Sequence, residues 1–287
     1  MKSDKLKLIS SMVIFGTIGL LRRSIPCSSA VVAMVRGFVG VGFLLLWRLL
    51  RGQRMNYGAM KGKLPLLLLS GALIGFNWVC LFEAYAYTSV SVATVCYYMA
   101  PVFVILASPF ILKEKLTLKK GLCALFAFVG MVLCSGLGSG ESNSLRGVAL
   151  ALAAALMYAS VILLNKRLTA IDAEERTAVQ LFAAAVALLP YVLKTGLPTA
   201  AELTPTVLLL LLVAGVVHTG LAYTLYFGSL NGVSGQTAAL MSYIDPVVAI
   251  LLSALLLHEK MSVAAAVGAA LVILSAIISE TKEKANG

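Results

Sequence analysis

Three ionisable side chains lie inside stretches of the sequence that are otherwise apolar. They are Asp245, His218 and Glu83. A charge near the middle of a bilayer costs at least about 2.5–3.5 kcal/mol, so we expect an ionisable side chain there to be paired or to serve the function of the protein. We interpret Asp245 as a proton-coupling site or as an anchor for a cationic amine. The alternative is a carboxylate that pairs locally with a hydroxyl or backbone group.

His218 and Glu83 each have two interpretations. His218 can titrate near neutral pH, which suits proton coupling, but a single histidine of this kind is as often a packed side chain. Glu83 lies within about a turn and a half of the end of its apolar stretch, so its carboxylate either faces a solute or reaches the interface. Arg36 lies deeper in another stretch, where we favour an architectural role.

Aromatic side chains accompany these groups. Gly71, Gly75, Trp78 and Phe82 are spaced at i, i+4, i+7 and i+11, which places them on one helix face and lets a neighbouring helix approach at the glycines. Aromatic rings attract organic cations, although plain packing explains the same pattern. The candidate substrate-binding or proton-coupling residues are Asp245, His218, Glu83, Trp78, Tyr97, Tyr98, Tyr223 and Tyr243.

Composition indicates the surroundings of these residues. The 287-residue chain is 60% hydrophobic and 12% charged, with a mean hydropathy of +0.97, which is far too apolar for one water-soluble core. Its apolar blocks have the roughly 17–25 residues that a helix needs to cross a bilayer, and strand-type alternation is absent. We predict an all-α integral membrane protein with ten transmembrane helices, at 7–23, 29–50, 64–85, 91–112, 118–135, 146–164, 177–193, 206–227, 236–257 and 262–279.

The second half of the chain repeats the first. Residues 98–117 return 145 residues later as residues 243–262, with 9 of 20 positions identical and no gap. The ten spans therefore divide into two five-span repeats, 8–135 and 146–280. Because five is odd, the second copy enters the membrane from the opposite side, which predicts an inverted-topology repeat.

Each copy has a proline inside a span, Pro101 or Pro246. A proline cannot donate a hydrogen bond to the carbonyl four residues back, so we expect a kink at each. In a membrane the freed carbonyl needs another partner, and paired prolines favour a pocket between the repeats. The alternative is a pair of packing kinks.

A glutamate follows each of these spans. Glu114 precedes Thr117, and Glu259 precedes Ser262. We expect the hydroxyl residues to cap the next helix, with the acid near the helix start where the macrodipole favours it.

Lys and Arg are distributed unevenly over the connections between spans. With the N-terminus in the cytoplasm, 17 of the 23 lie on the cytoplasmic side and five on the other, with Arg36 inside a span. By the positive-inside rule, both termini are cytoplasmic and the chain crosses the plasma or inner membrane several times. The same bias explains the net charge of +11 without a nucleic-acid partner.

Each half has Tyr-x-x-Pro-Val leading to Leu-x-Glu-Lys, and Tyr87-Thr-Ser-Val-Ser-Val-Ala93 precedes the first copy. These doubled motifs resemble the EamA family of the drug/metabolite transporter superfamily over roughly residues 8–280. The family usually has Leu-Gly-Glu where this chain has Leu112-Lys113-Glu114. This difference puts the local geometry of the loop in doubt. The resemblance implies a solute carrier, often an exporter of amino acids or other small metabolites, with a cavity lined by spans 1, 3, 4, 6, 8 and 9.

We predict a secondary active transporter that exports a small organic metabolite by alternating access, with proton coupling or exchange, as a monomer. The cavity helices 3, 4, 8 and 9 carry Glu83 and Asp245 but no Lys or Arg at membrane depth, which favours an amine, a quaternary ammonium or an amino-acid-like zwitterion over a polyanion. The alternatives are a channel, a non-transporting scaffold and an enzyme. We expect no catalysis, cofactor or metal, because the chain lacks HExxH, GxSxG, a Walker loop and a CxxC pair.

Overall fold

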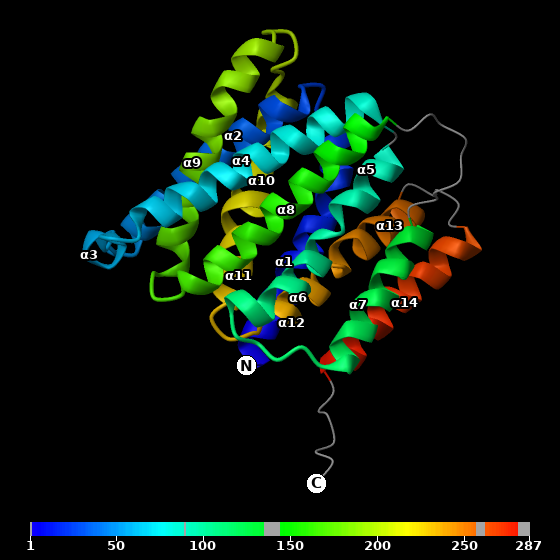
Figure 1. Cartoon of the computed structure of the whole chain (residues 1–287). Coiled ribbons are helices and arrows are strands. Elements are labelled where there is room, and N and C mark those ends of the chain that lie inside the picture. The colour runs from blue at the N-terminus through cyan, green and yellow to red at the C-terminus, as the bar shows by residue number, and fades with distance from the viewer. Residues whose placement is uncertain (1, 89, 135–143, 257–261, 281–287) are drawn as a thin grey trace.

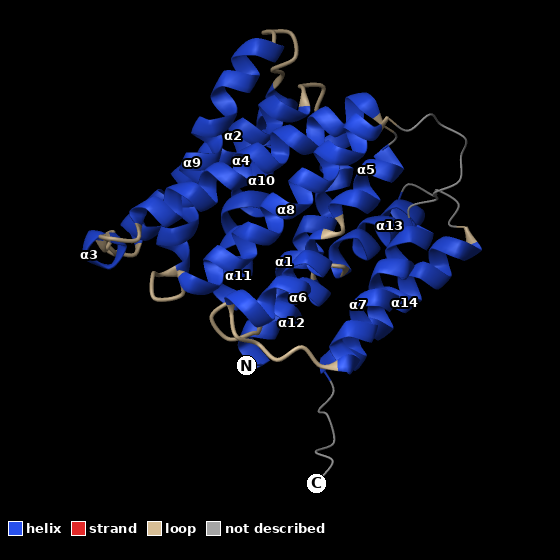
Figure 2. Ribbon diagram, viewed as in Figure 1, coloured by secondary structure: helices blue, strands red, loops and turns tan. Residues whose placement is uncertain are grey.

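The computed structural model describes residues 2–88, 90–134, 144–256 and 262–280 (Figure 1). Within these ranges the chain forms helices joined by turns and loops, without a strand (Figure 2). The helices are α1 Lys2–Arg23, α2 Ser29–Leu50, α3 Tyr57–Met60, α4 Leu64–Tyr87, α5 Val90–Tyr97, α6 Ala100–Ile111, α7 Leu118–Cys134, α8 Leu145–Arg167, α9 Ala173–Thr195, α10 Pro205–Gly215, η1 Val216–Leu221, α11 Ala222–Ser229, α12 Gly235–Met241, α13 Ile244–Leu256 and α14 Val263–Glu280.

Six helical stretches in the described part are long and apolar enough to cross a membrane. The all-helical membrane architecture expected from composition is therefore confirmed, whereas the count of ten stays a prediction. Helices α1, α7, α12 with α13, and α14 occupy the other four expected spans. The six stretches are Ser29–Leu50, Leu64–Tyr87, Val92–Ile111, Leu145–Arg167, Ala173–Thr195 and Pro205–Ser229.

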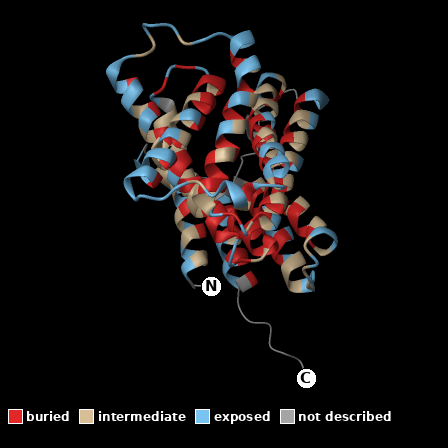
Figure 3. Ribbon diagram, turned by 90° about the vertical axis from the view of Figure 1, so that its left-hand side faces the viewer, coloured by how far each residue is buried: buried red, intermediate tan, exposed pale blue. Residues whose placement is uncertain are grey.

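The helices pack around a buried interior, and large apolar side chains are also exposed on the outside of the bundle (Figure 3). Helix α4 packs against α8 and α9, α1 packs against α11 and α13, and α7 pairs with α14. A Cβ atom added at Gly71 would lie 2.5 Å from the carbonyl oxygen of Gln180, and one at Gly75 would lie 2.7 Å from that of Ala184. The expected close helix approach at these glycines is confirmed, because α9 leaves no room for a side chain there.

Both prolines lie just after a short turn that interrupts their helix. A turn separates α5 from α6 before Pro101, and another separates α12 from α13 before Pro246. The Tyr243 hydroxyl donates a hydrogen bond of 2.8 Å to the carbonyl oxygen of Tyr98. Each break thus belongs to a contact between the two halves of the chain.

The eighth expected span contains a π-helical turn, η1, between α10 and α11. The Thr219 hydroxyl donates to the carbonyl oxygen of Ala214, five residues back, at 2.8 Å. Such wide turns often occur at functional sites. This one carries His218.

An ion-pair cluster ties the end of α2 to the start of α9. The Arg48 guanidinium donates to Asp172 Oδ1 at 2.7 Å, to Glu175 Oε1 at 2.7 Å and to Glu174 Oε2 at 3.3 Å. Asp172 also caps α9, and the backbone N–H of Asn56 donates to Glu175 Oε1 at 2.7 Å. Only 7% of Arg48 and 1% of Glu175 are exposed, so both charges depend on these contacts.

Glu114 caps a helix of the other half. Its Oε1 accepts a hydrogen bond from the backbone N–H of Gly235 at 2.6 Å, and its Oε2 accepts one from that of Gln236 at 3.1 Å, both at the start of α12. The acid thus has a capping role, but at α12 rather than at the helix that follows it, where it was expected. Thr117 does cap that helix, α7, by accepting from the N–H of Lys120 at 3.3 Å. The corresponding Glu259 lies outside the described residues.

Lys113 explains how the chain turns toward α12. Its φ of 57° is in the left-handed region, which glycine adopts without steric cost and other residues rarely adopt. The loop therefore has the geometry that the Leu-Gly-Glu pattern of the resemblance requires, with lysine in the place of glycine.

Candidate functional site

A cavity of about 630 Å³ lies inside the bundle. Expected spans 1, 3, 4, 6, 8 and 9 line it, as the resemblance implied. The α2 helix, which is expected span 2, lines it as well through Ser29, Val32, Ala33 and Arg36. Leaving span 2 out of the cavity wall was therefore wrong.

Five of the eight candidate residues line this cavity. They come from four expected spans and combine one carboxylate with four aromatic rings. These five are Trp78, Tyr97, Tyr98, Tyr223 and Asp245.

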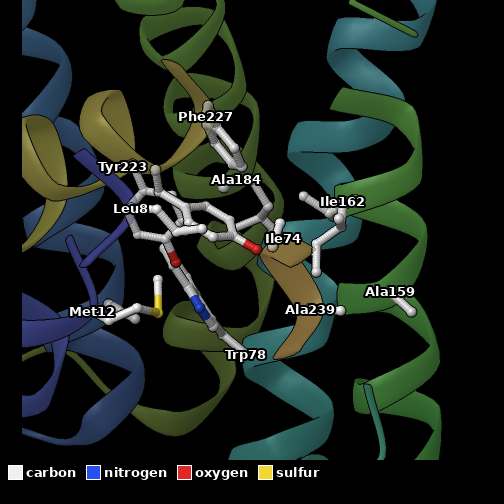
Figure 4. Packing of buried hydrophobic residues seen from close by; sticks show 14 of the residues in the cluster. Leu8, Met12, Ile74, Trp78, Ala159, Ile162, Ala184, Tyr223, Phe227 and Ala239 are labelled. Carbon is white, nitrogen blue, oxygen red and sulfur yellow. The ribbon is translucent and has the colours of Figure 1, made fainter. Parts of the chain in front are cut away.

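Aromatic rings form much of the wall. The Trp78 and Tyr223 ring centroids are 6.4 Å apart and nearly perpendicular, and Phe15 meets Tyr223 edge-on at 5.1 Å. Figure 4 shows Trp78 and Tyr223 close together, with Met12 of α1 beside them. On the other side, Tyr97 stacks on Tyr158 at 5.8 Å. The rings supply apolar area and faces to which a cation can bind.

His218 lies beside the cavity rather than in its wall. Its Nε2 is 2.8 Å from the Thr17 hydroxyl oxygen, which is also 2.7 Å from the carbonyl oxygen of Ile14. The tautomer of the imidazole decides which of the two groups donates in this contact. Nδ1 is buried without a hydrogen-bond partner. Protonation of both ring nitrogens would place a charge between α1 and η1.

Glu83 and Tyr243 also lie outside the wall. The Tyr191 hydroxyl of α9 donates to Glu83 Oε1 at 2.8 Å, so the assumption that this carboxylate faces the cavity is wrong. Tyr243 is fully buried and uses its hydroxyl to bridge the two broken spans. The sequence predicted a negatively charged cavity from two carboxylates, Glu83 and Asp245. Of these two, Asp245 lines the cavity and Glu83 does not.

Arg36 is a charged cavity residue that sequence reasoning assigned to the architecture instead. Its guanidinium carbon lies 4.6 Å from the centroid of the Trp78 ring. Ser29, Val32, Ala33 and Arg36 all face the cavity, at positions i, i+3, i+4 and i+7 of α2. That spacing, with an arginine at membrane depth, was the available signal. Expected spans 3, 4, 8 and 9 do bring no Lys or Arg to the wall, but span 2 brings Arg36, so the conclusion that the fixed charge of the cavity is negative is wrong.

Among the described residues, no group of three or more His, Cys, Asp or Glu side chains could hold a metal ion. Cys27, Cys80, Cys96 and Cys123 are free thiols in that same part of the chain. What the cavity offers a ligand is one carboxylate, two arginines and aromatic faces. One of the arginines, Arg22, already donates to the backbone carbonyls of Ile25 and Cys27.

The sequence matches the EamA-like transporter family over residues 5–136 and 145–281. It is 32% identical to the uncharacterized transporter YxxF of Bacillus subtilis (strain 168) over 250 residues, covering 86% of this chain and 79% of that protein. It is 30% identical to protein PecM of Dickeya dadantii (strain 3937) over 220 residues, covering 74% and 72% of the two chains.

One solved crystal structure of a protein shares the fold. The TM-score is 0.84 at 20% sequence identity, and the match covers 98% of this chain and 97% of that one. The whole described bundle, including the helices around the cavity, thus follows a known arrangement.

Proposed function

The chain belongs to the EamA-like transporter family, within the drug/metabolite transporter superfamily, and is a multi-pass membrane transporter. From this premise we propose that it moves a small organic metabolite by secondary active transport. The observation that carries the proposal is the cavity of about 630 Å³ inside the bundle, with one carboxylate, two arginines and aromatic rings in its wall. A polar site inside an apolar bundle suits a solute that must leave water and return to it.

Alternating access needs a cavity that is closed at one end. The lining extends to Arg22 and Ser29, at the connection between α1 and α2. At the other end, Glu114 caps α12, and the side-chain amide of Gln236 donates to the Ser108 hydroxyl at 2.7 Å. We propose that the structure is outward-facing, with its cytoplasmic end closed by these contacts.

Pairwise packing supports ten spans in two inverted repeats, 8–135 and 146–280. Helix α4 packs on α8 as α11 packs on α1, and α6 packs on α8 as α13 packs on α1. The pairs α2 with α9 and α7 with α14 join equivalent helices of the two halves. Repeats related in this way can exchange conformations, which opens the cavity on one side and then on the other.

The proposed substrate is an amine, a quaternary ammonium or an amino-acid-like solute, exported by a monomer. Asp245 supplies the negative charge, and the rings of Trp78 and Tyr223 can face an ammonium group. Phosphorylated metabolites are disfavoured because they need several basic groups. Coupling to protons or to exchange follows from the acid in the cavity and from the unpartnered Nδ1 of His218.

Asp245→Asn is expected to lower transport by about tenfold or more and to remove its dependence on a pH gradient, since the amide neither carries charge nor exchanges a proton. The measurement is flux of amines and amino acids in proteoliposomes, with and without a pH gradient. Flux that saturates with solute also separates a carrier from a channel or a scaffold.

Glu83→Gln is the control, because it neutralises a carboxylate that pairs with Tyr191 outside the cavity. We expect its flux and pH dependence to follow the parent protein. Unchanged transport in Asp245→Asn would reduce Asp245 to a structural role.

The proposed topology predicts which loops are accessible from outside the cell. In a background without the five native cysteines, Ala201→Cys in the α9–α10 connection should react in whole cells with a membrane-impermeant maleimide. Gly52→Cys, in the equally exposed α2–α3 connection, should react only after the cells are opened. Labelling of Gly52→Cys in whole cells would invert the proposed orientation.

A further inference from the structure

Arg36 and Asp245 face the same cavity without a polar partner. In the part of the chain that the structure describes, neither side chain makes a hydrogen bond or an ion pair within 4.0 Å, and the Nε of Arg36 is buried and unpaired. The contact made by the guanidinium is with the Trp78 ring, at 4.6 Å. Two opposite charges are thus held apart in one apolar chamber.

This separation is unusual for charges at membrane depth. Ionisable groups in a bilayer normally pair with one another or with backbone carbonyls. Arg48 shows the ordinary arrangement in this protein, with three carboxylates and a carbonyl around its guanidinium. Arg22, which also lines the cavity, is paired in the ordinary way, because its terminal nitrogens donate to the carbonyls of Ile25 and Cys27. Arg36 has no such partner, so its terminal nitrogens remain available to a ligand.

The geometry of Arg36 suits a carboxylate. The guanidinium lies over the Trp78 ring, and its terminal nitrogens, unlike the buried Nε, carry donors in a fork that matches the two oxygens of a carboxylate. Asp245, at the start of α13, offers the complementary acceptor for an ammonium group.

We propose that Arg36 binds the carboxylate and Asp245 the ammonium group of a zwitterionic substrate. A ligand that lacks either group would then bind less tightly, because it leaves one of the two side chains unpaired. The inference rests on the proposed transport function and narrows its substrate class. An amine alone would meet Asp245 but leave Arg36 unpaired and repelling, and a carboxylic acid alone would do the reverse. A zwitterion satisfies both groups and adds no net charge to the cavity.

The test uses two sets of ligands that differ only in charged groups. One is leucine with isoamylamine and isocaproate, and the other is phenylalanine with phenethylamine and hydrocinnamate. Binding to the purified protein is followed by thermal stabilisation, and transport by counterflow in proteoliposomes. We expect an amino acid to bind at least about tenfold more tightly than its amine or its acid, which corresponds to ~1.4 kcal/mol.

Two variants test which residue binds which charged group of the substrate. Arg36→Gln should weaken amino-acid binding by about tenfold or more while leaving binding of the amine unchanged or stronger, and Asp245→Asn should do the same in favour of the acid. Arg146→Gln is the matched control, because Arg146 also lies over an aromatic ring, that of Tyr87 at 4.1 Å, but outside the cavity. The control should keep the parent's preference.

The outcomes separate this inference from the transport function. Saturable flux of an amine that equals that of its amino acid, with Arg36→Gln unaffected, would overturn the two-charge site and leave a transporter of cations. Absence of flux and binding for every ligand in both sets would overturn the zwitterion assignment, and flux of other metabolites would then decide the function separately. If Arg36→Gln fails to fold, Arg36→Lys retains the charge without the fork and should still lose affinity for the amino acid.

Discussion

Arg48→Met is expected to destabilise the protein by about 3–5 kcal/mol, the usual cost of removing one partner from a buried ion pair. The substitution leaves the Glu175 carboxylate, which is 1% exposed, with the backbone N–H of Asn56 as its remaining donor. It also removes the link from α2 to Asp172, which caps α9. The midpoint of thermal unfolding of the purified protein in detergent measures the loss.

Arg54→Met is the control, because Arg54 is an exposed arginine a few residues away on the same connection. Its replacement should change the free energy of unfolding by less than about 0.5 kcal/mol. The double variant Arg48→Met with Glu175→Leu should recover much of the lost stability, because no uncompensated charge remains. Equal unfolding midpoints for Arg48→Met and Arg54→Met would show that the cluster contributes little.

Glu114→Gln is expected to open the closed end of the cavity. In the parent protein, the two carboxylate oxygens of Glu114 accept from two backbone N–H groups of α12. The glutamine amide has a single acceptor oxygen, so its NH₂ group would face the second backbone N–H. Hydrogen bonds to a charged group contribute about 1.5–3 kcal/mol, so their loss shifts the balance between closed and open states roughly 10- to 100-fold. We expect a maleimide to react with Ser242→Cys, in the cavity wall, correspondingly faster in inside-out vesicles.

Glu202→Gln provides a control with the same chemistry on the opposite side. Its carboxylate accepts from the backbone N–H of Thr199 at 2.7 Å and from the Thr199 hydroxyl at 2.9 Å, and these bonds hold the pKa of Glu202 below its ordinary value. This contact lies within one loop, so the labelling rate should not change. A Glu114→Gln protein that reacts at the parent's rate would mean that other contacts keep the end closed.

The helical architecture could be predicted because hydrophobic length and loop charge are local properties of the chain. Proline positions indicated where two spans are interrupted, since a missing donor acts on its own helix. The partner of a freed group could not be predicted in the same way. Tyr243 reaches the carbonyl of Tyr98, its equivalent residue in the first copy, but the repeat does not reveal that the two residues meet. Glu114 reaches α12 across 121 residues, a separation that carries no periodic signal.

The site was predicted where side chains follow helix periodicity and was missed where tertiary contacts decide. Trp78 and Asp245 line the cavity as expected. Glu83 was misplaced because its partner, Tyr191, lies 108 residues away on a helix whose position the sequence does not reveal. Arg36 was assigned to the architecture because the resemblance left its span out, although its own helix face already indicated the cavity.

The π-helical turn η1 has a further consequence for the shape of the cavity wall. Ala214 and Tyr223 are nine residues apart and both line the cavity. In an uninterrupted α-helix of 3.6 residues per turn, about two and a half turns would separate them, on opposite sides of the rod. A π turn takes up one extra residue, which rotates the following segment back by about 100°. The helical phase of this span is thus reset within the membrane, so that one helix faces the same chamber above and below the turn.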